Sequence, residues 1–231
     1  MKRNVKIPDV FRKIQGGPQL VRNCWKLISS GHDEEEMMRL LDVLVREGYC
    51  VPNNIILGPL VKVHLKTVDL QRAVSVFKEF TEKYKCTPLQ LELLSTLVEY
   101  EKLELLEETL SYCCKVHGKE ATSIQAIAAF AQNGLHKPLK KFLLEIKGVN
   151  KKEFEKRCQR WVNENMIIPL ETLARAAQSL PPNTIDKDLV HYSIMRLHSI
   201  NNDCDAALNF YRDLLDTENK VSKKRQMNFY G

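Results

Sequence analysis

Apolar residues recur at helical spacing along almost the whole chain. Leu57, Leu60, Val61 and Leu65 are three or four residues apart, so they would share one face of a helix. Similar series occur within residues 70–77, 103–114, 124–131 and 207–214. We find no stretch with the period-two alternation, bounded by turn residues, that indicates a β-strand. The sequence therefore predicts an all-α fold of amphipathic helices.

Short polar breaks separate these helices at regular intervals. The breaks fall near residues 31, 68, 104, 134, 165 and 202, so successive breaks are 37, 36, 30, 31 and 37 residues apart. Their mean of about 34 residues is the period of repeats built from helical hairpins. A single hairpin cannot bury both of its faces, so neighbouring hairpins must stack. We therefore predict a right-handed α-solenoid of about six degenerate helix-turn-helix repeats, with about twelve helices.

The predicted solenoid covers residues 18–217. Residues 1–17 are predicted to be an irregular lead-in, and residues 218–231 a basic C-terminal tail. Residues 1–30 resemble an organelle transit peptide in charge, but Pro8 and the run from Gly16 to Pro18 interrupt any helix there. The irregular lead-in is therefore the favoured interpretation.

The unit that starts near Asn54 carries the clearest repeat signature. Its second helix is predicted to begin at Asp69, Ala73 and Phe77 follow at four-residue steps, and Pro88 closes the unit. This pattern resembles a pentatricopeptide repeat, and residues 40–220 are similar to the leucine-rich animal branch of that family. The resemblance implies binding of single-stranded RNA, stabilisation of mitochondrial messenger RNA, and partnership with a small RNA-recognition-motif protein.

One feature of the family is missing. In members that read sequence, the fifth residue of each unit is usually Asn, Ser or Thr and contacts a base. The corresponding residues of this chain are Val21, Gly58, Leu94, Ile124, Glu155 and Tyr192. We therefore expect any RNA binding to be weakly selective for sequence.

Charge is unevenly distributed. Residues 31–50 and 89–120 each carry a net charge of −4, whereas residues 121–160 carry +6, which equals the net charge of the whole chain. Such a block can neutralise phosphates, or it can be a solvated face. The candidate RNA-binding residues are Lys137, Lys140, Lys141, Lys147, Lys151, Lys152, Lys156, Arg157 and Arg160. Phe142, Phe154 and Trp161 interleave with them and would either stack on bases or, as their helical spacing favours, lie in the core.

Other clusters favour a structural interpretation. Cys113 and Cys114 continue an apolar helix face, so we expect buried, unreactive thiols rather than a metal site with His117. His191 and His198 share a face without a ligand partner at suitable spacing. The odd number of cysteines, seven, indicates free thiols in a reducing compartment. No apolar run is long enough to span a bilayer.

These patterns predict an RNA-binding repeat scaffold, with a protein-binding adaptor as the alternative. No phosphate loop or hydrolase motif is present, so we predict no catalytic residues, no cofactor and no metal. The resemblance places the protein in mitochondria; the other possible locations are the cytoplasm and the nucleus. We also expect Ala73 and Ala207 to lie where the two helices of a hairpin approach closely.

Overall fold

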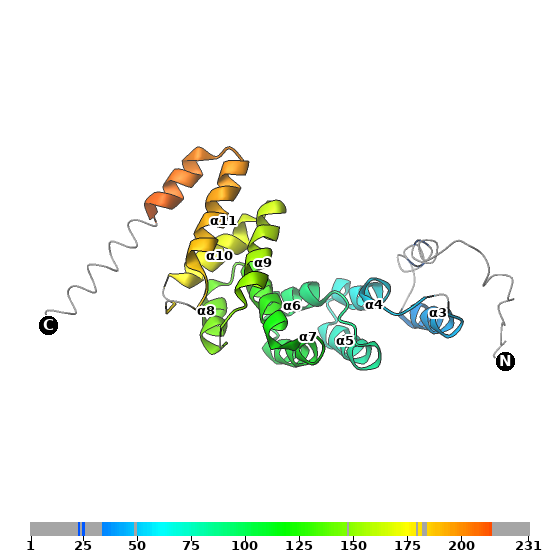
Figure 1. Ribbon diagram of the computed structural model, residues 1–231. Helices are drawn as coiled ribbons and strands as arrows, with labels where there is room; N and C mark the ends of the chain where they lie inside the picture. The colour runs from blue at the N-terminus through cyan, green and yellow to red at the C-terminus, as the bar shows by residue number, and fades with distance from the viewer. Residues whose placement is uncertain are drawn as a thin grey trace, which may run out of the picture. The chain divides into compact units, whose positions relative to one another are not determined.

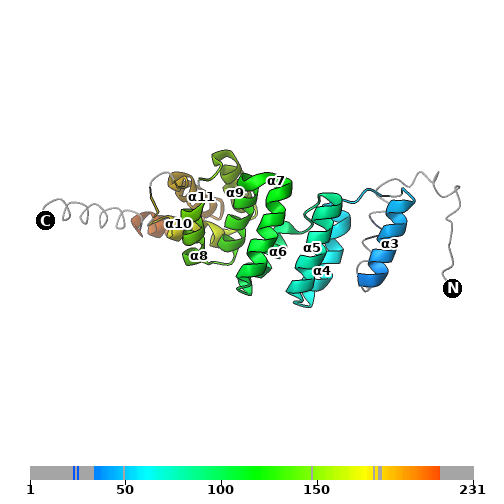
Figure 2. The same cartoon turned by 90° about the horizontal axis from the view of Figure 1, so that it is seen from below.

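The regular elements of the described chain are all helices (Figures 1 and 2). The computed structural model describes residues 23 and 25, and residues 34–213 except 49, 147, 179, 182 and 183. The predicted lead-in, the basic tail, the break near residue 31 and Val21 lie outside this part. The prediction of an all-α solenoid of helical hairpins is confirmed for the described residues.

The helices follow one another with short connections. Their bounds are α3 Glu34–Arg46, α4 Asn54–Lys66, α5 Leu70–Tyr84, α6 Gln90–Glu99, α7 Leu103–Gln132, α8 His136–Glu145, α9 Lys151–Asn163, α10 Ile167–Ala177 and α11 Lys187–Ile200. Residues 204–213 form a further helix. Gly118 interrupts α7 with φ 77° and ψ 169°, so α7 consists of two helices, residues 103–117 and 119–132.

Five turns in the described residues share one backbone geometry. At the centre of each is a residue with positive φ: Val68, Glu101, Gly134, Asn165 and Asn202. Its N–H bonds to the carbonyl three residues earlier, and the next N–H bonds to the carbonyl five residues before it, as in Val68 to Leu65 (3.3 Å) and Asp69 to His64 (3.0 Å). This is the Schellman arrangement, which satisfies carbonyls left free at a helix end. Each turn therefore joins two antiparallel helices in the same way.

These turns define the repeats. The central residues are 33, 33, 31 and 37 positions apart. The predicted breaks near 68, 134, 165 and 202 are confirmed, whereas the break predicted near residue 104 lies at Glu101. The five hairpins pair α4 with α5, α6 with residues 103–117, residues 119–132 with α8, α9 with α10, and α11 with residues 204–213. In each hairpin the helix before the turn is the first helix, and the helix after the turn is the second helix.

The chain divides into two compact units, residues 1–118 and 119–231. In the first unit α3 packs on α4, α4 on α5, and α5 on α6. Phe77 and Phe80 of α5 and Leu57 of α4 are fully buried in its core. Glu34 of α3 also lies 3.1 Å from Nε2 of the buried His64 and pairs with Arg72, which fixes α3 to this hairpin.

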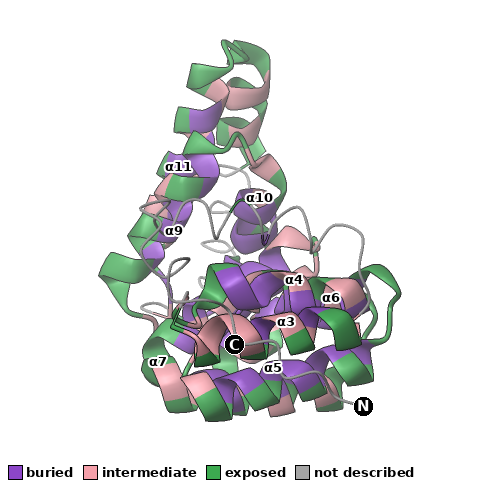
Figure 3. Ribbon diagram, turned by 90° about the vertical axis from the view of Figure 1, so that its right-hand side faces the viewer, coloured by how far each residue is buried: buried purple, intermediate pink, exposed green. Residues whose placement is uncertain are grey.

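In the second unit the helices form two layers. The second helices α8 and α10 pack on each other, the first helices α9 and α11 do the same, and α10 also contacts α9 and α11. Phe154 and Trp161 of α9 are buried in the core of this unit. Figure 3 shows the buried residues as stripes along the helices, bordered by exposed residues, as expected for amphipathic helices. Among the described helices none combines the length and apolar character needed to cross a membrane.

Candidate functional site

The predicted basic block is divided between two helices of the second unit. Lys137, Lys140 and Lys141 lie on α8, and the cations from Lys151 to Arg160 lie on α9, while Lys147 is outside the described residues. Because α8 packs on α10 and α9 packs on α11, the two groups belong to different helical layers. Each group is therefore a separate surface, and the α9 group forms the larger candidate site.

Three cations of α9 form a stripe at four-residue steps, and we call Lys152, Lys156 and Arg160 the cationic stripe. All three are exposed. Lys156 donates to Glu153 at 2.6 Å and Arg160 to Glu164 at 2.8 Å. Ion pairs this exposed contribute little, roughly 0–1 kcal/mol. The two cations can therefore exchange a carboxylate for a phosphate at small cost.

Arg157 differs from its neighbours because it is buried. Only 9% of the residue is exposed, and its guanidinium donates to Oε1 of Gln125 at 2.9 Å. Burial, followed by repulsion from Arg160, lowers the pKa of Arg157. The residue connects α9 to the C-terminal half of α7, so it positions the stripe rather than extending it as a free surface cation.

A small pocket opens beside the stripe, between α9 and the C-terminal half of α7. Its volume is about 200 Å³, which is below the roughly 300–1,000 Å³ of pockets for drug-sized ligands. It can hold one ring or one phosphate rather than a helix. The lining residues are Ala121, Ile124, Gln125, Glu153, Lys156, Arg157 and Arg160.

The three aromatic residues of the basic block belong to the interior. Phe154 and Trp161 are buried, and Phe142 is half-buried with its ring centroid 5.7 Å from that of Phe130. The interpretation of these residues as core is therefore confirmed. The exposed aromatic residue of this layer is Tyr192 of α11, which the sequence had marked only as a fifth residue without a standard base-contacting side chain.

Of the two neighbouring thiols, Cys113 is buried as the apolar pattern predicts, whereas Cys114 is less buried than predicted. Cys113 is buried, and burial raises its pKa to about 12, while Cys114 is half-buried. Nε2 of His117 lies 2.7 Å from the hydroxyl of Thr87. Within residues 34–213 and the other described positions, no three His, Cys, Asp or Glu side chains are placed to hold a metal.

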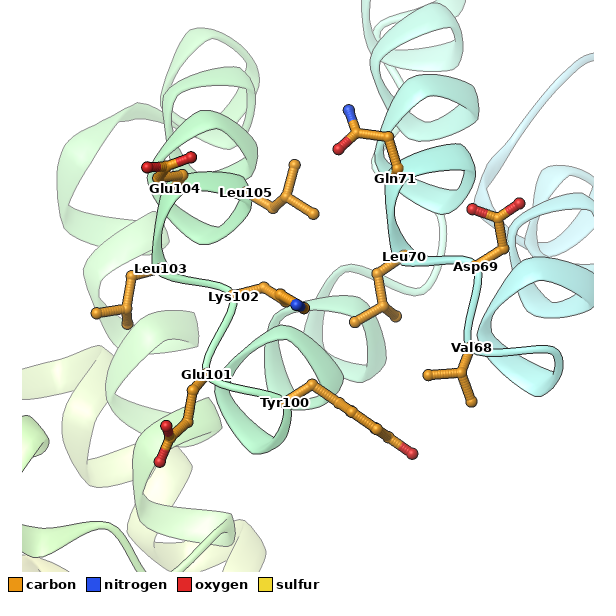
Figure 4. A pocket seen from close by; sticks show the side chains of 10 residues that line it. All are labelled: Val68, Asp69, Leu70, Gln71, Tyr100, Glu101, Lys102, Leu103, Glu104 and Leu105. Atoms are coloured by element: carbon orange, nitrogen blue, oxygen red, sulfur yellow. The ribbon is translucent and has the colours of Figure 1, made fainter.

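The first unit contains a different site, a pocket of about 640 Å³ between two successive turns (Figure 4). Leu70 and Leu105 face each other across this space, and Lys102 points between them. The other lining residues are Val68, Asp69, Gln71, Tyr100, Glu101, Leu103 and Glu104. The lining therefore combines exposed apolar groups with three carboxylates and one ammonium group.

The two units also differ in charge. Residues 34–118 contain 14 acidic and 10 basic side chains, a net charge of −4, whereas residues 119–213 contain 14 basic and 11 acidic ones, a net charge of +3. Phosphate-bearing ligands are therefore favoured at the second unit and disfavoured at the first.

Comparison with known proteins agrees with the helical repeats. The chain is 26% identical over 195 residues to the mitochondrial leucine-rich PPR motif-containing protein of Rattus norvegicus, covering 84% of the chain and 14% of that protein. The chain is related to this protein. The Mus musculus protein of the same name is 28% identical over 171 residues, covering 73% of the chain and 12% of that protein.

The Xenopus tropicalis leucine-rich PPR motif-containing protein shows the same relationship, with 26% identity over 200 residues, 84% of the chain and 14% of the relative. The chain thus spans about one seventh of the length of the curated relatives that it matches. No protein-family profile matches the chain. No solved structure matches it.

Proposed function

We propose that this protein is a helical-repeat scaffold that binds single-stranded RNA and stabilises or presents mitochondrial messenger RNA, without a catalytic role. The observation that supports RNA binding most is the exposed cationic stripe of α9 beside a pocket that holds one ring or phosphate. Lysine and arginine side chains along one helix face can follow a phosphate backbone. The relatives are named as mitochondrial proteins, which supports the mitochondrial location.

The side chains around the stripe favour weak sequence selectivity. Ile124, a fifth residue by the repeat count, lines the pocket as an apolar side chain and has no group that distinguishes one base from another by hydrogen bonding. Affinity would come from phosphate contacts and stacking, which every RNA offers. Partnership with a small RNA-recognition-motif protein, implied by the family resemblance, stays a prediction.

The test is a salt series of RNA binding with charge reversal of the stripe. Replacing Lys152, Lys156 and Arg160 together by Glu should weaken all single-stranded RNAs alike. The slope of log affinity against log salt should fall by about 0.7 for each lost phosphate contact, hence by about 2 in total. The stripe is exposed, so helical content by circular dichroism should stay unchanged.

A matched control reverses Lys137, Lys140 and Lys141 of α8, which changes the net charge equally on the other layer. If both triple variants weaken binding to the same extent, net charge rather than the stripe determines affinity. A parent protein that does not bind RNA at low salt would overturn the proposal.

The alternative function, a protein adaptor, has support from the pocket of the first unit. Val68, Tyr100 and Leu103 expose 44%, 45% and 60% of their surface around that pocket. Asp69, Glu101 and Glu104 place carboxylates at its edge. This combination suits an apolar side chain of a partner peptide that is flanked by basic residues.

A labelled peptide with one phenylalanine between pairs of lysines would test the adaptor. Leu103→Glu should abolish its binding, and Leu144→Glu, at a residue of α8 that is also exposed, should not. Peptide binding unaffected by Leu103→Glu, or no binding at all, would rule out this pocket as the adaptor site.

A further inference from the structure

The C-terminal end of α8 exposes a leucine flanked by lysines. Leu144 has 53% of its surface accessible, whereas the preceding Leu143 is buried. Lys140 and Lys141 lie four and three residues before Leu144, so both are its neighbours on the helix surface. Of the exposed large apolar residues in the described part of the chain, only Leu144 has two basic residues at these positions. The end of α8 therefore presents an apolar group beside two ammonium groups.

The charges of α8 are free to bind a partner. No salt bridge to another described residue is formed by its four charged side chains, Lys137, Lys140, Lys141 and Glu145. The cationic stripe differs, because two of its three cations pair with glutamates and because none of the large apolar residues of α9 is exposed. The combination of unpaired lysines and an exposed leucine therefore belongs to α8 and not to α9.

The pocket of the first unit has the opposite pattern (Figure 4). Val68, Tyr100 and Leu103 are exposed around it, and its volume of about 640 Å³ is ample for a leucine side chain. Its charged lining residues are three carboxylates and one ammonium group, whereas α8 carries three lysines and one glutamate. None of these lining residues forms a salt bridge with another described residue: Asp69, Glu101, Lys102 and Glu104. The pocket and the end of α8 are therefore complementary in charge and in apolar character.

Other occupants fit the end of α8 less well. RNA phosphates would pair with its lysines but would gain nothing from the exposed Leu144. Binding to a membrane surface requires a helix with a free apolar face, and Leu139 and Leu143 of α8 are buried within the unit. A protein surface with both carboxylates and an apolar recess matches all of these groups, and this chain contains such a surface.

We propose that the pocket of one copy binds the Leu144 end of α8 in a second copy, so that the chain associates with itself head to tail. This inference rests on the adaptor pocket proposed above and names its partner. The net charges of −4 on residues 34–118 and +3 on residues 119–213 favour the approach of unlike units. Because the two surfaces differ, each copy can use both at once, which gives a ring or an open chain of copies.

Charge reversal on each surface, followed by mixing, tests this pairing. Sedimentation velocity of the full chain without RNA at low salt should show a sedimentation coefficient that rises with concentration, and high salt should suppress the rise. Glu101→Lys with Glu104→Lys, and Lys140→Glu with Lys141→Glu, place like charges on both surfaces, so each double variant should stay monomeric. An equimolar mixture of the two should associate again, because each then supplies the charge that complements the other. Restored association would also show that both variants fold.

The role of Leu144 and the specificity for α8 have their own controls. Leu144→Glu should weaken association about ten-fold or more, because it removes the apolar contact and places a carboxylate among carboxylates. Leu144→Met keeps an apolar side chain and should associate like the parent. Lys152→Glu with Lys156→Glu changes the net charge of the chain equally on α9 and should leave association unchanged.

The outcomes separate self-association from the adaptor pocket. A parent that stays monomeric but binds the lysine-flanked phenylalanine peptide would overturn self-association and leave the adaptor pocket standing. A parent that neither associates nor binds the peptide would overturn both. If the mixture of charge-reversed variants stays monomeric, or if the α9 variant also loses association, the pairing of the pocket with α8 is wrong.

Discussion

Burial determines the chemistry of individual thiols in this chain. Cys113 and Cys158 are buried, and burial raises the pKa of each to about 12. Cys204 is exposed at the start of the last described helix. Because the thiolate is the reactive form, a thiol with this pKa is deprotonated at pH 8 in only about one molecule in 10,000.

We therefore expect a thiol reagent at pH 8 to modify Cys204 quickly and Cys113 and Cys158 only after urea is added. Raising the pH from 7 to 9 should leave the two buried thiols protonated and unmodified. Mass spectrometry of digested protein would identify the modified residues. Fast modification of Cys113 without denaturant would contradict its buried place in the helix.

A second prediction concerns small residues at helix contacts. Ala73 of α5 is fully buried, whereas Ala207 is only half-buried. Ala73→Phe should lower the free energy of unfolding by about 1–3 kcal/mol through overpacking, and Ala207→Phe by less. Urea unfolding followed by circular dichroism measures both. Equal losses would contradict the smaller effect expected at Ala207 and would support the expectation from sequence that both alanines lie at close helix contacts.

At the scale of elements, the turns place different residues in the same strained conformation. Gly134 adopts φ 71° without penalty, but Val68 has φ 59° and is β-branched. The left-handed conformation costs an ordinary residue about 1–2 kcal/mol. Val68→Gly should therefore raise the free energy of unfolding by about 1 kcal/mol, and Gly134→Val should lower it by a similar amount.

Chemical denaturation of the two variants measures these effects. No atom outside the neighbouring residues lies within 4 Å of a Cβ added to Gly134, so backbone conformation is the expected main cause of its loss of stability. A destabilised Val68→Gly variant would show that contacts of the valine side chain outweigh the backbone strain.

The kink in α7 also results from a residue with positive φ. Gly118 has φ 77° and ψ 169°, a combination that is open essentially only to glycine. Gly118→Ala should lower the free energy of unfolding by about 1–3 kcal/mol, because a Cβ there meets no atom within 4 Å and only the backbone is strained. Thermal melts measure the change. A variant with higher helicity and unchanged stability would show that α7 straightens without cost.

The sequence predicted most elements because their signals are local. Helix faces such as Leu57 to Leu65 and turns such as Asn133-Gly134 depend on neighbouring residues only. The turn at Glu101 was placed three residues late, because Tyr100-Glu101-Lys102 contains none of the residues that favour turns. The kink at Gly118 was not predicted, since one glycine in a helical pattern is compatible with a continuous helix.

At the scale of the whole molecule, the acidic first unit and the basic second unit should respond differently to RNA. Hydrogen–deuterium exchange with and without single-stranded RNA would measure this. We expect slower exchange in α9 and α11 of the bound protein and no change in α4 to α6, because phosphates avoid the net charge of −4. Protection in the first unit alone would contradict the assignment of RNA to the second.

The candidate site was only partly predictable, because it depends on contacts between residues that are far apart in the sequence. The cations of α9 are visible in sequence, but the burial of Arg157 depends on Gln125, 32 residues earlier. The separation of the α8 lysines from the stripe depends on which helix each one packs against. The exposure of Tyr192 likewise follows from the rotation of α11, which tertiary packing determines.

The identical turns have a consequence for how such a chain can change in evolution. In each hairpin three residues separate the helices, whereas the connections between hairpins vary from a single glycine at Gly118 to the nine residues 178–186. One residue inserted into a turn would disturb its two hydrogen bonds and the pairing of its helices; one inserted between hairpins need not alter either. Gains and losses of residues between the relatives should therefore concentrate between hairpins, so that a lineage can lengthen, shorten or duplicate the array while each hairpin is inherited whole.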